Sequence, residues 1–265
     1  LAAAGMEYPT LFTVGLGIQL PTWLRFPEAI AVHEFGHQYW YGLVANNEFE
    51  AAWMDEGLNS YMEAKIVNRL YGSRSTRLPV LGLWGWHHDG AMAPEAFSTD
   101  PPNTYAWQFA NRASYNANSY NKPMLALLTL ERLYGSDEVT RALRAYFRAW
   151  QFRHPYPEDF FRAMQVHLGE AAAEFLRKAL NTTDTIDFRV AEVKCVPVRR
   201  SPGFYGYGTQ RRWRAPEEVT NRWKCGVLIR RLGTWAVPVE VQIRFRDGQA
   251  TTFVWDGKRQ WFRWA

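Results

Sequence analysis

The sequence predicts an α+β fold, in which a mostly helical domain over residues 1–185 precedes a small antiparallel β-sandwich over residues 186–265. Apolar residues recur with helical spacing up to about residue 180 and alternate with polar residues after it. The charge changes at the same place: residues 1–180 carry 15 basic and 18 acidic side chains, whereas residues 181–265 carry 16 and 8. A chain of 265 residues is also long enough for two domains.

A first helix is predicted from Pro27 to about Asn46. Proline is favourable in the first turn of a helix, and Glu28 complements the positive end of the helix dipole. A second helix is predicted to begin near Asp55 and to end at Gly72, because glycine is a common helix stop.

Residues 73–117 are rich in Gly, Pro, Asn and Trp, which predicts irregular structure with at most short helices. Four helical patterns follow, and Ser136 is a suitable N-cap for the second of them. The four segments are MLALLTLERLYG, SDEVTRALRAYFRAW, PEDFFRAMQVHLG and EAAAEFLRKAL.

The last part of the chain reads as strands. In VEVQIRFR every second residue is apolar, which is typical of a half-buried strand, and Asp247-Gly248 predicts a hairpin turn before TTFVW. Asp256-Gly257 predicts another turn. FRVAEVKCVPV and WKCGVLIRR are further predicted strands, and SPGFYGYGTQRRWRAPEE between them is expected to be a long surface loop.

The basic second part has two interpretations. A solvated basic face is one, and a weak association with an anionic surface is the other. Its aromatic residues do not match a nucleic-acid-binding signature, so no nucleic-acid partner is expected. Cys195 and Cys225 either form one disulfide in an oxidising compartment or remain core thiols. No stretch approaches the roughly 20 apolar residues that span a bilayer.

The stretch HEFGHQYWYG, residues 33–42, carries the clearest chemical signal. Residues four apart on a helix lie about 40° apart around its axis, so His33 and His37 can share one metal ion. Glu34 lies beside them, where its carboxylate can reach a metal-bound water as a general base. The pattern therefore predicts a zinc-dependent hydrolytic site, and the alternative is a pair of core or surface histidines, because short motifs recur by chance.

Glu56 supplies a third predicted ligand, because it follows His37 after eighteen intervening residues and lies in WMDEGLNSYMEA. Zinc in a hydrolytic site takes three protein ligands and leaves one position open. These residues resemble the aminopeptidase N-like branch of the gluzincin zinc peptidases, whose signature is HExxH, eighteen residues and a glutamate. WMDEG also resembles the family's W-L-x-E-G. The resemblance implies a thermolysin-like catalytic domain with one Zn²⁺ held by His33, His37 and Glu56.

The same resemblance implies a tyrosine whose hydroxyl stabilises an oxyanion. Tyr120 in SYNKPMLALLTLERLYG matches its place before an apolar helix, and the nearby Tyr115 is the competitor. Asn47, Asp55, Asn59 and Glu63 are all candidates for orienting the ligating histidines.

AGMEYP near the start resembles the family's G-x-M-E-N strand, whose glutamate binds the substrate's free amino group. Glu7 is the implied amine anchor, and Gly5 and Met6 are the implied contacts to the substrate backbone. The match is incomplete, because Ala4 replaces the first family glycine and Tyr8 replaces the asparagine.

Together these residues predict zinc-dependent hydrolysis of peptide bonds, with removal of N-terminal residues as the preferred reaction. A thermolysin-type endopeptidase and a non-catalytic peptide-binding scaffold are the alternatives. The complete metal set favours an enzyme. WGWHHDG, with His87 and His88, is read as a loop surface in preference to a second metal site.

The resemblance also implies a large N-terminal β-domain. Such a domain would precede Leu1, so the chain is expected to belong to a longer precursor. A periplasmic, secreted or membrane-associated location is preferred over a cytoplasmic one.

Overall fold

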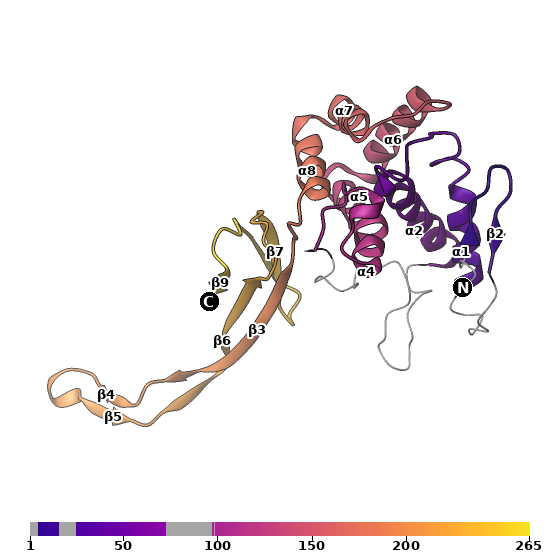
Figure 1. Cartoon of the computed structure of the whole chain (residues 1–265). Helices are drawn as coiled ribbons and strands as arrows, with labels where there is room; N and C mark the ends of the chain where they lie inside the picture. Colours follow the sequence, from indigo (N-terminus) through magenta and orange to yellow (C-terminus); the bar gives the residue numbers. More distant parts are fainter. Residues whose placement is uncertain (1–4, 16–24, 73–96, 98) are drawn as a thin grey trace. The chain divides into compact units, whose positions relative to one another are not determined.

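The computed structural model describes residues 5–15, 25–72, 97 and 99–265 (Figure 1). The chain divides into two compact units, Leu1–Asp184 and Thr185–Ala265, and the predicted boundary lies one residue further along the chain. The first unit is mostly helical and the second consists of strands, so the predicted α+β class is confirmed. Among the described residues, no helix is both long and apolar enough to cross a bilayer.

The first unit begins with a short β-hairpin and continues as helices. Its strands are β1 (Gly5–Met6) and β2 (Thr13–Val14), which pair antiparallel. Its helical elements in chain order are α1 (Phe26–Gly36), η2 (Trp53–Gly57), α2 (Leu58–Tyr71), η3 (Ala106–Gln108), α4 (Arg112–Asn116), η4 (Ala117–Asn121), α5 (Lys122–Tyr134), α6 (Ser136–Trp150), α7 (Pro157–Leu168) and α8 (Glu170–Asn181).

The first predicted helix was too long. α1 ends at Gly36, whereas the sequence pattern continued to Asn46. Consecutive turns replace the helix, because the Gly42 amide donates to the His37 carbonyl and Tyr41 adopts a left-handed backbone with φ 88°. The apolar residues that follow pack inside these turns, so they imitate a helical pattern without forming one.

Ser136 does not cap α6 as predicted. Gly135 precedes the helix, and Ser136 is its first residue. The Ser136 hydroxyl donates to Glu131, which also accepts from Tyr61 at 2.7 Å and from Lys65. This carboxylate therefore joins α2, α5 and the start of α6.

An aromatic core holds η2 in place. The ring centre of Trp53 lies 5.4 Å from that of Phe160 and 5.9 Å from that of Phe161. The ring centre of Tyr146 lies 5.1 Å from that of Phe160. The Trp53 indole N–H donates to Asn103 at 3.1 Å, so the buried ring keeps its polar partner.

Both η2 and η4 are π-helical turns, and each runs directly into a longer helix, α2 or α5. The two turns pack against each other. Gly57 permits this contact, because a Cβ atom there would lie 2.9 Å from the backbone oxygen of Ser119 on η4. Turns of this kind recur at functional sites, where they redirect side chains.

The second unit contains two packed sheets. β3 (Phe188–Arg200), β6 (Glu217–Arg231) and β9 (Trp261–Trp264) form one antiparallel sheet in the order β3-β6-β9. β7 (Val239–Arg244) and β8 (Ala250–Trp255) form the other. Val227 and Ile229 of the first sheet share an apolar cluster with Trp255 of the second, as the predicted β-sandwich requires.

The segment predicted as a surface loop is instead a hairpin. β4 (Gly203–Tyr205) pairs with β5 (Arg212–Arg214) at the far end of the β3–β6 ribbon (Figure 1). Phe204 packs across the strands on Trp213, which stabilises the pairing. Further along the ribbon, Cys195 and Cys225 lie directly opposite each other and form a disulfide.

Candidate metal centre

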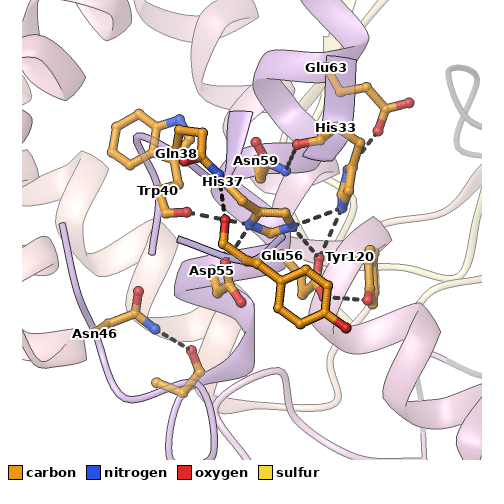
Figure 2. A network of polar contacts seen from close by, with 12 residues as sticks. His33, His37, Gln38, Trp40, Asn46, Asp55, Glu56, Asn59, Glu63 and Tyr120 are labelled. Carbon is orange, nitrogen blue, oxygen red and sulfur yellow. Dashed lines mark hydrogen bonds and ion pairs between the residues drawn. The ribbon is translucent and has the colours of Figure 1, made fainter. Parts of the chain in front are cut away.

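Three predicted ligands converge on one point (Figure 2). His33 lies on α1, His37 follows the end of that helix, and Glu56 comes from η2. Nε2 of His33 lies 3.1 Å from Nε2 of His37 and 3.1 Å from Oε2 of Glu56. Nε2 of His37 lies 3.2 Å from the same carboxylate oxygen. Residues distant in sequence thus present a compact triangle of two nitrogens and one oxygen.

The triangle fits zinc. Bonds of about 2.0–2.2 Å in a tetrahedral site separate neighbouring ligand atoms by about 3.3–3.6 Å, close to the observed spacing. Two imidazole nitrogens and one carboxylate oxygen are also a donor set that zinc uses in catalytic sites.

A carboxylate faces the other ring nitrogen of each histidine. Nδ1 of His33 lies 3.0 Å from Glu63, and Nδ1 of His37 lies 2.6 Å from Asp55. These carboxylates favour a proton on Nδ1, which leaves the Nε2 lone pairs directed at the shared point. Such outer partners raise the basicity of a ligating imidazole and fix its orientation.

Two of the four candidate orienting residues therefore contact an imidazole, and the other two do not. Asn59 donates to the backbone carbonyl of His33 at 2.7 Å, which ties α2 to α1. Gly36 allows this approach, since a Cβ atom there would lie 2.0 Å from Oδ1 of Asn59. Asn47 serves a local turn, because its Oδ1 accepts from the amide of Phe49.

The pKa values reflect this concentration of charge. Burial lowers the pKa of His33, but Glu56 and Glu63 outweigh it and raise that pKa to about 9. Burial raises the pKa of Glu56, and the hydrogen bonds from both histidines reverse the effect and bring it to about 2. The carboxylate oxygens around the two imidazoles thus form a site that stabilises positive charge.

Glu34 lies beside the triangle, against the backbone of β1. A Cβ atom at Gly5 would lie 2.1 Å from Oε1 of Glu34, so a larger residue there would displace this carboxylate. Burial raises the pKa of Glu34 to about 7. Its Oε2 is buried and has no hydrogen-bond partner among the residues that the structure describes.

Glu7 reaches the same place from the end of β1. Its carboxylate oxygen lies within 4.8 Å of ligand atoms of Glu34 and His37, and also within 4.8 Å of Asp55 and Glu56. Met6, the neighbouring predicted contact, is 37% exposed on β1. The structure therefore brings the start of the chain to the metal triangle.

Glu48 is a carboxylate that the sequence did not single out. Burial raises its pKa, and the negative charges of Glu7 and Glu56 raise it further, so it faces the same group of acids. No spacing rule connects it to the HExxH pattern, because it lies on the irregular segment before η2.

Tyr120 lies on η4 and donates a hydrogen bond from its hydroxyl to Oε1 of Glu56. Its ring stacks on His33 at a centroid distance of 5.9 Å. The ring centre of Tyr115 lies 6.3 Å from that of Tyr120. Of the two tyrosines weighed from sequence, Tyr120 is the one in contact with a predicted ligand. The segment with His87 and His88 lies outside the described residues.

Comparison with protein families adds a separate finding. The model of the peptidase family M1 domain matches residues 24–179, which contain α1, both π-helical turns and nearly all of α8.

Curated proteins with similar sequences include leukotriene A-4 hydrolase from Xenopus laevis, 29% identical over 165 residues, and leucine aminopeptidase 2 from Kluyveromyces lactis, 27% identical over 174 residues. These alignments cover 59% and 56% of this chain but 26% and 24% of the relatives. The chain thus spans about a quarter of the length of these relatives.

Solved structures with a similar fold include Legionella pneumophila aminopeptidase A in complex with aspartic acid, with a TM-score of 0.54, 15% identity and coverage of 91% of this chain and 24% of that one. The M1 zinc metallopeptidase from Deinococcus radiodurans aligns with a TM-score of 0.50 and 19% identity over 69% of this chain and 38% of that one. At these identities the similarity establishes the fold.

Proposed function

The chain belongs to peptidase family M1, and from this premise we propose that it hydrolyses peptide bonds with zinc and releases residues from the N-terminus of peptides. The observation that carries the proposal is the meeting of the His33, His37 and Glu56 donor atoms beside two further carboxylates, Glu34 and Glu7. This constellation provides a metal site, a base and an anchor for a positive charge within one cluster.

One Zn²⁺ is the proposed cofactor, held by His33, His37 and Glu56. When bound, zinc lowers the pKa of a coordinated water to about 7 and polarises a carbonyl group. Asp55 and Glu63 keep the imidazoles oriented through their contacts with Nδ1.

Glu34 is the proposed general base. Its Oε2 has no hydrogen-bond partner among the described residues, so it can take a proton from the attacking water and return it to the leaving amine. The close approach of Gly5 limits where this carboxylate can lie. A fixed position matters because proton transfer needs the base within hydrogen-bond reach of the reacting atoms.

Tyr120 is the proposed oxyanion donor. Its hydroxyl already lies at a ligand carboxylate, and its ring is held against His33. A hydroxyl in this position can release Glu56 and donate to the negative oxygen that forms on the scissile carbonyl.

Glu7 is the proposed anchor for the substrate's α-amine, with Gly5 and Met6 beside the substrate backbone. The Glu7 carboxylate lies within 4.8 Å of Asp55 and Glu56, and the negative charges of Glu7 and Glu56 raise the pKa of Glu48, so several acids could attract a cationic group here. A thermolysin-type endopeptidase is the second candidate, because the same metal set serves internal peptide bonds when no amine is required.

The test compares an unblocked peptide with its N-acetylated form, using the 265-residue chain loaded with zinc. We expect about one zinc per chain and hydrolysis of the unblocked peptide, with Glu34→Gln as the inactive control that keeps its metal. Equal cleavage of both peptides would establish the endopeptidase instead. If the chain binds zinc but cleaves neither peptide, the result would favour the non-catalytic peptide-binding scaffold.

A further inference from the structure

The hairpin tip, residues 199–216, combines arginines with aromatic rings and no acidic residue. Its basic residues are Arg199 and Arg200, which pair across the ribbon with Glu218 and Glu217, and Arg211, Arg212 and Arg214. Its aromatic residues are Phe204, Tyr205, Tyr207 and Trp213. A solvated basic face does not require aromatic side chains, so the combination needs another explanation.

The rings are displayed rather than buried. Tyr207 is 95% exposed, Phe204 60% and Trp213 58%. Gly206 and Gly208, with φ of 95° and 53°, flank Tyr207 and provide the left-handed backbone of the turn. The turn therefore holds a large amphipathic side chain out at the end of the ribbon.

Two arginines of the tip lie over its aromatic rings. The guanidinium of Arg211 lies 5.1 Å from the ring centre of Phe204, and that of Arg214 lies 5.9 Å from the ring centre of Tyr205. Phe204 in turn contacts Trp213 at 5.3 Å. Charge and apolar surface are thus interleaved on one small structure, as at a membrane interface, where rings lie at headgroup level and cations meet phosphates.

The Cys195–Cys225 disulfide fixes the two strands that carry the tip. Disulfides persist in oxidising compartments such as the periplasm, the ER lumen and the cell surface, all of which are bordered by membranes. The ribbon is also only two strands wide at its end, which suits shallow insertion into an interface.

We propose that the hairpin tip docks this chain on an anionic lipid surface. The exposed rings of Phe204, Tyr207 and Trp213 enter the headgroup region, and Arg211, Arg212 and Arg214 bind lipid phosphates. The docked chain would lie on a membrane face that borders an oxidising compartment, in line with its disulfide. The inference does not depend on the proposed peptidase activity, because none of these residues belongs to the metal centre.

The test measures sedimentation of the 265-residue chain with vesicles of phosphatidylglycerol and phosphatidylcholine, and with vesicles of phosphatidylcholine alone. We expect binding to the anionic vesicles only. Each arginine near such a surface contributes about fivefold, so replacing Arg211, Arg212 and Arg214 by Gln should weaken binding about 100-fold. The matched control replaces three exposed helix arginines, Arg144, Arg148 and Arg162, by Gln and should bind as the wild type does.

A second pair of measurements tests the rings. Tyr207→Ser with Trp213→Ser should weaken vesicle binding about tenfold or more, since the rings lose their apolar burial. Brominated lipids should quench the tryptophan fluorescence of the wild type more than that of Trp213→Phe. Because the replaced side chains lie outside the buried clusters of both units, circular dichroism should show the same overall fold in all variants. Tyr207→Ser alone keeps the Phe204–Trp213 pair and should still weaken binding.

Three outcomes would overturn the proposal. The first is the absence of binding to anionic vesicles. The second is binding that the helix control loses as strongly as the tip variant. The third is tighter binding to heparin or duplex DNA than to vesicles with no effect of the ring substitutions, which would assign the tip to a polyanion instead.

Discussion

The hydroxyl of Tyr120 donates a hydrogen bond to Oε1 of Glu56, and both residues lie on π-helical turns. The other oxygen of the same carboxylate, Oε2, lies 3.1 Å from Nε2 of His33. One glutamate therefore joins the proposed oxyanion donor to the metal triangle.

Replacing Tyr120 by Phe should lower kcat about 10²–10³-fold, because the transition state loses one hydrogen-bond donor. Zinc content should stay near one per chain, measured by elemental analysis. Tyr115→Phe is the matched control and should retain most activity, since Tyr115 lies beyond Tyr120. Reversed effects of the two substitutions would transfer the role to Tyr115.

Glu34→Gln should lower kcat about 10²–10⁴-fold, the usual contribution of a general base, and should leave zinc binding intact. The amide preserves the size of the side chain beside Gly5, so the fold should not change. If Glu34→Gln loses zinc as well as activity, Glu34 is a metal ligand and not the general base.

Asp55→Ala should weaken zinc affinity about 10–100-fold, because Nδ1 of His37 loses the carboxylate 2.6 Å away and keeps the Trp40 carbonyl at 3.4 Å. Asp55→Asn should restore part of the affinity, since its amide oxygen can still accept from Nδ1. Competition with a fluorescent zinc chelator measures the effect without any assay of activity. If Asp55→Ala and the wild type bind zinc with equal affinity, the contact between Asp55 and His37 does not contribute to metal binding.

Glu7→Gln should raise KM for unblocked peptides more than it lowers kcat, because the substrate's amine loses an opposite charge. N-acetylated peptides should be poor substrates of both proteins. If Glu7→Gln discriminates against acetylated peptides as strongly as the wild type does, Glu7 does not recognise the substrate's amine.

Lys122 predicts a pH dependence of stability in the first unit. Burial lowers its pKa from 10.5 to about 8, although Asp184 partly opposes the shift, and its ammonium donates to the carbonyls of Thr182 and Phe97. Between pH 8 and 10.5 the unfolded chain binds more protons at this lysine than the folded chain does. The contribution of Lys122 to the free energy of unfolding should therefore rise with pH over this range.

Urea unfolding of the wild type and Lys122→Met at pH 7.5 and at about pH 10 measures this effect. The difference between the two proteins should shift in favour of the wild type at the higher pH. A difference that is constant across the two values would contradict the lowered pKa.

Much of the fold could be predicted because periodicity reports burial directly. The alternation in VEVQIR became β7, and its Asp247-Gly248 turn leads into β8. The end of α1 could not be predicted, because the turns after Gly36 bury apolar residues much as a helix does. The β4–β5 pairing was missed because its aromatic pair, Phe204 and Trp213, lies on short strands rich in glycine and arginine.

The pairing of His33 with His37 was predictable from spacing, since a four-residue separation on a helix places both on one face. Glu56 was predicted from the resemblance to the gluzincin signature. The orienting partners of the histidines could be named but not ranked, because the choice among Asn47, Asp55, Asn59 and Glu63 depends on how the segments around α1 and α2 pack. Glu48 has no sequence signal, because only the folded chain brings it to Glu7.

The π-helical turns make the length of η2 and η4 more critical than most of their side chains. A π turn contains one residue more than an α turn, so deleting one residue from either segment would restore a regular helix. The helix would gain ordinary hydrogen bonding, yet every residue before the deletion would rotate by about 100° relative to those after it. Such a protein can fold with greater stability while Glu56 or Tyr120 points away from the other site residues. The number of residues in each of these two turns therefore determines the alignment of the site.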